Sequence, residues 1–267
     1  MRWIITLTLF FTTCQVACAH GFRTSISQPA PYVQPQVVTL GQNDVIAIVG
    51  DSVTGRGECP GGWINILRQY VAAYHSQYNF QFLNAGYAYL SSTVLNYPGT
   101  GIGSWNTNVV AKAPTVIFIW IGIDDILVNH GVTTAGPWDM AGYGQNLQAI
   151  INAARQIPTV RQIVLVTPLC AGERYYGQNP QDPYLNQVIA VIQQTSINNN
   201  IPVLNMRAMA ISAEYAYNRG DFPQGVLTGD GIHPYTNPSV YPGDRVSFLS
   251  PLMESLIAGE FIKGCGM

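Results

Sequence analysis

The sequence predicts an α/β domain in which helices cover both faces of a five-stranded parallel sheet. Strand-like apolar runs alternate with segments of helical periodicity over most of the chain. Such alternation is typical of βαβ units, whose right-handed crossovers place helices on both faces of a sheet. The run APTVIFIWIG, residues 113–122, is continuously apolar, as expected for a strand that is buried on both faces.

Five short apolar or β-branched runs are predicted as strands because turn residues bound them. The first lies in residues 44–52, where the strand itself stops at Gly50. The others are residues 80–86, 113–122, 161–168 and 201–206. The first predicted helix, residues 61–78, has Trp63, Ile64, Leu67 and Val71 at helical spacing. Further helices are predicted over residues 140–156, 183–199 and 246–262.

The N-terminal residues predict a secretory signal peptide over residues 1–19. Arg2 precedes a short apolar core, and Ala17 and Ala19 provide a small-x-small cleavage site. An uncleaved anchor is the alternative. Residues 20–42 are rich in Pro, Gln and Ser and predict an extended arm, so the folded domain is expected over residues 43–267.

Composition excludes several classes of partner. The chain is 48% hydrophobic and 10% charged with a net charge of -2, and its twelve basic residues are scattered and form no stripe for nucleic acid. No internal apolar run is long enough to span a membrane. Three cysteines remain after the signal peptide, which suggests one disulfide and one free thiol. The sequence does not fix the pairing; Cys59 with Cys265 is favoured, because Cys170 follows a predicted buried strand. No cluster has metal-site spacing, and no cofactor is expected.

Chemistry is expected where the strands end, because ligands of open parallel sheets bind beyond their carboxyl ends. Ser52 follows the first strand in GDSVT, while Asp230 and His233 lie in GDGIHP near the other end of the chain. These side chains can provide a nucleophile, a base and a carboxylate that orients the base. Taken singly, a capping serine and a polar surface turn are the simpler interpretations. The Gly-x-Ser-x-Gly motif that carries the nucleophile of the usual α/β-hydrolase fold is absent, which argues against that fold.

Four blocks of the sequence, IVGDSVTG, FLNAG, WIGIDD and LTGDGIHP, occur in the order and rough spacing of the SGNH, or GDSL-type, hydrolases. The chain resembles this family from Val45 to about its C-terminal helix. The resemblance implies a flavodoxin-like three-layer α/β/α sandwich and ester hydrolysis through an acyl-enzyme, without metal or cofactor. It implies that Ser52 is the nucleophile, His233 the base and Asp230 the orienting carboxylate.

The same resemblance implies an oxyanion hole built from the N–H groups of Ser52 and Gly86 and from an asparagine side chain. Asp124 occupies the asparagine's position, and Asp125 matches a structural aspartate of the family. An ionised carboxylate only accepts hydrogen bonds, so it would repel an oxyanion. Three interpretations stay open: Asp124 is protonated and donates, it turns away and leaves a slower enzyme, or the chain has kept only binding.

Two loops are candidates for contact with substrate: residues 97–108, which include Trp105, and residues 170–184, which include Tyr175 and Tyr176. Packing at the surface is the alternative for both. Asp51 and Asn84 are further candidates at strand ends.

The sequence therefore predicts a secreted serine esterase for short-chain acyl esters, with acetylated carbohydrate as a candidate substrate. A lipase or thioesterase for longer acyl chains, and a carbohydrate- or lipid-binding module weakened in catalysis by Asp124, are the alternatives.

Overall fold

A computed structural model describes residues 38–87, 105–130, 140–219, 221–222, 224–234, 247 and 249–267. The predicted signal peptide and the arm up to residue 37 lie outside this range. The predicted five-stranded parallel sheet is confirmed, with the strand order β2-β1-β3-β4-β5 of flavodoxin-like domains. Its strands are β1 (Val45–Gly50), β2 (Gln81–Gly86), β3 (Val116–Trp120), β4 (Gln162–Val166) and β5 (Val203–Leu204).

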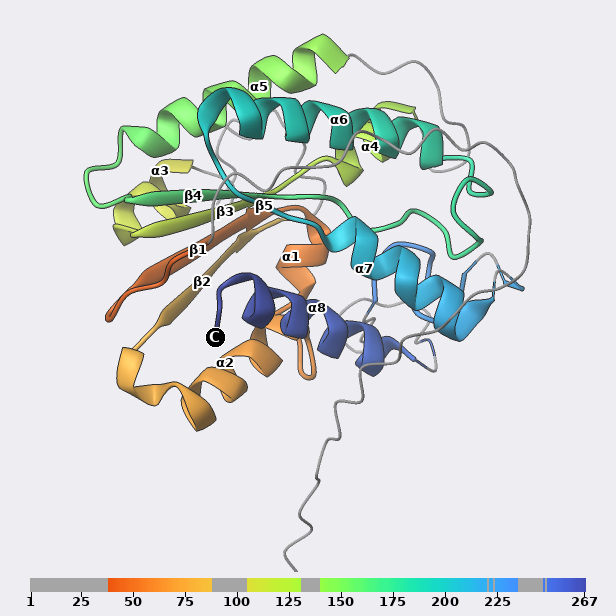
Figure 1. Ribbon diagram of the computed structural model, residues 1–267, viewed down its shortest axis with the longest axis horizontal. Helices are drawn as coiled ribbons and strands as arrows, with labels where there is room; N and C mark the ends of the chain where they lie inside the picture. The colour runs from red at the N-terminus through yellow and green to blue at the C-terminus, as the bar shows by residue number, and fades with distance from the viewer. Residues whose placement is uncertain are drawn as a thin grey trace, which may run out of the picture. The chain divides into compact units, whose positions relative to one another are not determined.

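Helices cover both faces of this sheet (Figure 1), as the sequence predicts. On one face lie α2 (Trp63–Tyr74), α7 (Met206–Ala213) and α8 (Ser250–Gly264). On the other lie α4 (Ile123–His130), α5 (Met140–Arg155) and α6 (Asp182–Asn199). The short elements are α1 (Ser52–Arg56), η1 (Ser76–Tyr78), α3 (Trp105–Asn108), η3 (Val110–Lys112) and η4 (Glu214–Asn218). No helix of the described residues has the length and apolar composition needed to cross a bilayer.

The strand predicted over residues 113–122 is shorter in the structure, because β3 ends at Trp120. No helix was predicted directly after it, but α4 begins at Ile123, and Asp124 and Asp125 lie in its first turn. Carboxylates are favourable in a first helical turn because they face unsatisfied backbone N–H groups. The prediction also omits α1 and α7, which are too short to show helical periodicity.

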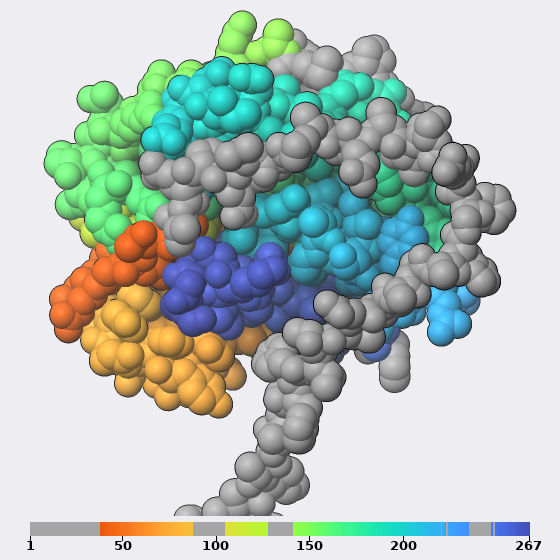
Figure 2. All heavy atoms as spheres, in the orientation of Figure 1, coloured from red at the N-terminus to blue at the C-terminus, as the bar shows by residue number. Residues whose placement is uncertain are grey.

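Aromatic side chains fill the layer between β3 and the α2/α8 pair. Trp63 of α2 stacks on Phe261 of α8, with ring centroids 4.7 Å apart and an interplanar angle of 9°. Trp120 meets Trp63 edge-on at 5.6 Å. Figure 2 shows α8 (dark blue) between α2 (gold) and α7 (cyan) on this face. These rings anchor β3, and with it the strand end that carries Asp124.

The described part of the predicted arm belongs to the folded domain. Val38 is buried in the core, and the backbone of Thr39 binds side chains next to β4: its N–H donates to Gln162, and its carbonyl accepts from Arg161. The folded domain therefore begins before residue 43, because the side chain of Val38 packs in the hydrophobic core.

The suggested disulfide between Cys59 and Cys265 is wrong, since both residues and Cys170 are free thiols. Cys59 lies in the turn before α2, whose first N–H, on Trp63, donates to Glu254 of α8. Cys265 follows Glu254 by eleven residues along that helix, about 16 Å at 1.5 Å per residue. A disulfide requires Cα atoms within about 7 Å. Burial raises the pKa of all three thiols, and that of Cys265 to about 12.

Candidate active site

The strand order places a crevice between β1 and β3, where the order reverses. Ser52 follows β1 there as the first residue of α1, and Asp51 caps this helix by accepting a 2.9 Å hydrogen bond from the N–H of Val53. The N–H of Ser52 has no acceptor within its own helix, because it belongs to the first turn. Asp124 follows β3 at the neighbouring strand end. The site therefore lies at the edge that the sequence predicts.

Ser52, His233 and Asp230 form a continuous hydrogen-bonded chain. His233 Nδ1 lies 2.6 Å from Asp230 Oδ2, and Nε2 lies 2.7 Å from Ser52 Oγ. A carboxylate only accepts hydrogen bonds, so Nδ1 carries the proton and Nε2 accepts from the serine hydroxyl. This is the arrangement that a general base needs to activate a serine.

The aspartate fixes the turn that carries the histidine. Its second oxygen, Oδ1, accepts hydrogen bonds from the N–H groups of Ile232 (3.0 Å) and His233 (2.8 Å). Gly231, which lies between Asp230 and Ile232, has φ +89°, a conformation that favours glycine. Burial acts to raise the pKa of Asp230, but the hydrogen bonds from the ring and backbone of His233 outweigh it and lower the pKa to about 2. Asp230 is therefore ionised at neutral pH.

Three buried carboxyl groups, Asp51, Asp124 and Asp125, lie at the two strand ends beside the serine. Burial, and then the charges of Asp124 and Asp125, raise the pKa of Asp51 well above its usual value. The same environment raises the pKa of the buried Tyr143, whose hydroxyl donates to the carbonyl of Ile121. Asp51 therefore binds a proton more tightly than a solvent-exposed aspartate does.

Gly86 does not present its N–H to the site. That N–H donates to Asn84 Oδ1 at 2.8 Å, and Asn84 Nδ2 donates to the carbonyls of Thr54 and Gly55 at the end of α1. A Cβ on Gly86 would lie 2.4 Å from the nitrogen of Gly55. Gly86 and Asn84 thus fasten α1 to β2. The expectation of Gly86 as an oxyanion donor and Asn84 as a substrate contact is corrected accordingly.

Trp105 is also placed away from the triad. It begins α3, which lies at the left in Figure 1 by the amino ends of the strands, whereas α1 follows the carboxyl end of β1. The predicted contact of Trp105 with substrate is therefore not supported. Residues 97–104 of the same candidate loop lie outside the described residues.

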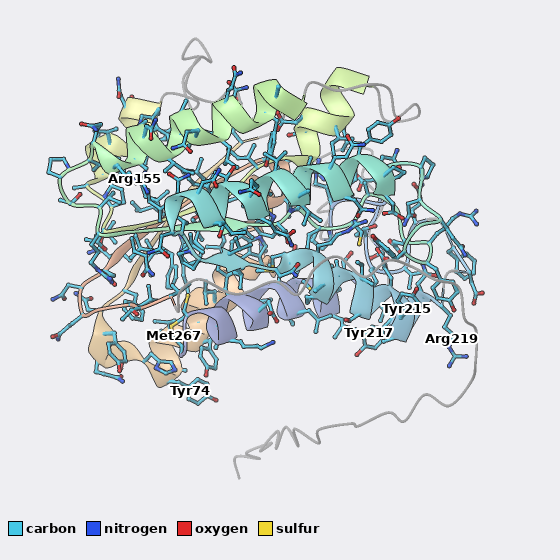
Figure 3. The ribbon with its side chains drawn as sticks, turned by 45° about the horizontal axis from the view of Figure 1, so that its top comes forward. Tyr74, Arg155, Tyr215, Tyr217, Arg219 and Met267 are labelled. Atoms are coloured by element: carbon cyan, nitrogen blue, oxygen red, sulfur yellow. The ribbon has the colours of Figure 1, made fainter. Side chains whose placement is uncertain are left out.

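The two tyrosines of the second candidate loop have protein neighbours. The ring of Tyr175 stacks on Tyr215 of η4, with centroids 4.8 Å apart. The guanidinium of Arg207 lies 5.7 Å from the centre of the Tyr176 ring, a cation–π contact. Tyr215 lies near the end of α7, on the opposite side of the described domain from Tyr74 (Figure 3). Packing thus accounts for Tyr175, while Tyr176 is 38% exposed.

A hollow of about 250 Å³ adjoins the triad on the side of Asp230. Its polar lining includes the side chains of Arg174, Gln181 and Gln224, and Ile232 and Leu127 provide an apolar part. A larger hollow of about 470 Å³ lies between α7 and α8 and contains no triad residue, so size alone does not indicate the site here. Among the described residues, no group of His, Cys, Asp and Glu side chains is placed to hold a metal ion.

Solved structures of known proteins share this fold. An acetyl xylan esterase named AlAXEase superposes with a TM-score of 0.66 and 20% identity, over 82% of this chain and 98% of that chain. Axe2, an acetylxylan esterase from Geobacillus stearothermophilus, superposes with a TM-score of 0.65 and 18% identity, over 86% of this chain and 97% of that chain. Other solved structures of Axe2 are catalytic mutants of a serine, an aspartate and a histidine. No curated protein matches.

The sequence itself also matches a family. Residues 48–236 match the family described as the GDSL-like Lipase/Acylhydrolase family, 189 of the 267 residues. The matched segment contains Ser52, Asp230 and His233. The chain therefore belongs to the GDSL-like lipase/acylhydrolase family and is a carboxylic ester hydrolase.

Proposed function

We propose that the protein is a secreted serine esterase that removes short acyl groups, acetyl foremost, from carbohydrate. The hydrogen-bonded chain from Ser52 through His233 to Asp230 carries the proposal for a serine esterase, because it joins a nucleophile to a base of defined tautomer. The proposal of secretion rests on residues 1–19 of the sequence alone.

The reaction proceeds in two halves. As Ser52 Oγ attacks the ester carbonyl, its proton moves to His233 Nε2, and Asp230 stabilises the imidazolium that forms. The C–O bond to the alcohol then breaks, and the alcohol leaves with the proton from Nε2, so the acyl group remains on Ser52. Water repeats the attack with His233 as base, which releases the carboxylic acid and restores the serine hydroxyl.

The developing oxyanion needs hydrogen-bond donors. The N–H of Ser52 is one candidate, because it lies in the first turn of α1. For the second, we propose a carboxyl group kept protonated within the cluster of Asp51, Asp124 and Asp125. The raised pKa of Asp51 supports a shared proton there. Donation would then be lost at alkaline pH as the cluster ionises.

Two observations favour carbohydrate as the alcohol half. The hollow beside Asp230 has arginine and glutamine side chains, which can hydrogen-bond to sugar hydroxyls. The solved structures of similar fold named above are acetyl xylan esterases. The fold alone does not transfer a substrate between proteins, so the acyl and alcohol preferences require direct measurement.

The first experiment compares hydrolysis of p-nitrophenyl acetate, butyrate and palmitate with release of acetate from acetylated xylan, from acid to mildly alkaline pH. Ser52→Ala is the control, and its turnover should be undetectable above the uncatalysed rate. Preference for acetate and for acetylated xylan supports the proposal. Preference for palmitate would favour a lipase, and folded protein without Ser52-dependent turnover would favour a binding module.

Asp124→Asn tests the oxyanion donor. The amide donates irrespective of pH, so we expect a faster alkaline rate and a broader pH profile than in the wild type. If neither the rate nor the profile changed, Asp124 would not contribute to the oxyanion hole.

A further inference from the structure

Glu173 lies in the loop that follows β4, and its side chain is at the centre of a dense set of hydrogen bonds. The residue is 1% exposed. Its carboxyl oxygens accept hydrogen bonds from four consecutive backbone N–H groups: Gly225 (3.1 Å), Val226 (3.1 Å), Leu227 (3.0 Å) and Thr228 (2.7 Å). The hydroxyl of Thr228 and the amide of Asn218 (3.2 Å) also donate to it.

All of these groups are donors, so Glu173 serves them as a carboxylate with both oxygens used as acceptors. Backbone dipoles here replace the water that a buried charge loses. A glutamine of the same shape would put an NH₂ group against N–H donors. The set of contacts therefore requires a carboxylate, and not only a side chain of this size.

The segment held by Glu173 leads directly into the catalytic turn. Thr228 Oγ1, which donates to Glu173, accepts the N–H of Gly231 at 2.9 Å. The carbonyl of Gly231 accepts the N–H of Gly172, the residue before Glu173, at 2.7 Å. Gly231 follows Asp230, so both sides of its backbone are tied to the loop of Glu173.

The other bonds of this segment come from Asp230 Oδ1, which accepts the N–H groups of Ile232 and His233, and from a small number of backbone pairs. Residues 224–234 contain no helix or strand. Within the segment, the N–H of Gly229 donates to the carbonyl of His233 at 3.0 Å, and that of Gly225 to the carbonyl of Thr228 at 2.9 Å. The bonds to Glu173 thus outnumber the backbone bonds that the segment makes within itself.

We propose that Glu173 is a positioning residue of the esterase: it fixes the loop that presents Asp230 and His233 to Ser52. This inference rests on the proposed function and adds to it a residue that does not touch the reacting atoms. Misplacing a catalytic group by about 1 Å can reduce turnover about a hundredfold. The loss should lie in kcat, because the affected alignment matters to the transition state and not to initial binding.

The test compares Glu173→Gln with Glu254→Gln, a matched control. Glu254 is also 1% exposed, but its side chain binds the N–H of Trp63 at the start of α2 and not the backbone of residues 224–234. With p-nitrophenyl acetate, Glu173→Gln should lower kcat about 10- to 100-fold and leave KM within about threefold. The control should retain the wild-type kcat.

Two further measurements separate positioning from loss of folded protein. Titration with a fluorophosphonate, which labels Ser52, should modify every molecule of Glu173→Gln, but more slowly than in the wild type. The downfield proton resonance of His233 Nδ1, expected from its 2.6 Å bond to Asp230, should shift or vanish in Glu173→Gln and persist in Glu254→Gln.

A kcat within about twofold of wild type together with an unchanged His233 resonance would overturn the proposal, as would a smaller fraction of reactive sites that label at the wild-type rate. If Glu173→Gln does not fold, Thr228→Val carries the same test, because it removes the hydroxyl that links Glu173 to Gly231. If wild-type protein shows no Ser52-dependent turnover, the proposed function fails, while the His233 resonance still tests Glu173.

Discussion

The pH dependence of stability can be predicted from Glu254, a buried carboxyl group that caps a helix from a distant part of the chain. Its Oε2 accepts the N–H of Trp63 at 2.7 Å, and the N-cap residue Gly62 provides no side chain for that role. Burial raises the pKa of Glu254 from 4.5 to about 8, although the hydrogen bond from Trp63 acts to lower it. The folded state therefore binds a proton more tightly than the unfolded chain does.

The sign of the effect follows from this raised pKa. The contribution of Glu254 to stability is fully present below pH 4.5, the pKa in the unfolded chain, and is lost as the pH rises through about 8. Each pKa unit corresponds to about 1.36 kcal/mol, so the loss is roughly 5 kcal/mol between pH 4 and 9. Glu254→Gln keeps an acceptor for Trp63 and removes the ionisation, so this loss should disappear.

The assay is urea unfolding followed by tryptophan fluorescence at several pH values, with the difference in unfolding free energy between variant and wild type plotted against pH. Taking the difference cancels the titration of other groups. We expect the unfolding free energy of Glu254→Gln, relative to that of the wild type, to rise by roughly 5 kcal/mol from pH 4 to pH 9. Glu260→Gln, on the same helix but partly exposed, is the control substitution. A difference for Glu254→Gln that is constant within about 1 kcal/mol would refute the argument.

Three further substitutions test the site and its support. Asp230→Asn should leave the fold intact and lower kcat about 10⁴-fold, because the histidine loses its tautomer and orientation; steady-state kinetics that show less than a tenfold loss would contradict the triad. Gly86→Ala should destabilise the domain by about 1–3 kcal/mol in urea and slow turnover, since its Cβ meets Gly55; wild-type stability and rate would disprove that close contact. Arg207→Met should cost about 3–5 kcal/mol because it leaves Asp182 buried without its cation, and urea unfolding with a loss under about 1 kcal/mol would exclude this.

The strands were predictable because each is a local apolar run, and continuous apolarity indicates burial on both faces. Helix ends were predicted less well. The first helix was expected through Tyr78, but α2 ends at Tyr74, and η1 follows after His75, whose φ of -133° breaks the helix. That ending depends on backbone geometry, which hydrophobic periodicity does not report.

The candidate triad residues could be named from sequence because Ser52, just past the first strand, and Asp230, three residues before His233, lie in blocks that resemble those of the SGNH hydrolases. The roles of Gly86 and Asn84 were not, because residue type does not tell where an N–H points. Both residues lie at the expected edge, yet their polar groups bond to each other and to α1. Polar residues at strand ends indicate where a site lies, but they do not show which of those residues take part in it.

The sequence by itself determined the parallel sheet, the edge at which its strands end and the three residues proposed as the triad, since these depend on local patterns and on chemistry that few residue types provide. The tertiary structure alone decided which buried acids serve the site and which serve the fold. Glu173 meets Thr228 across 55 positions, and Glu254 meets Trp63 across 191. The physical reason is that a carboxylate's role depends on the donors that surround it, and in this protein folding brings those donors from distant parts of the chain.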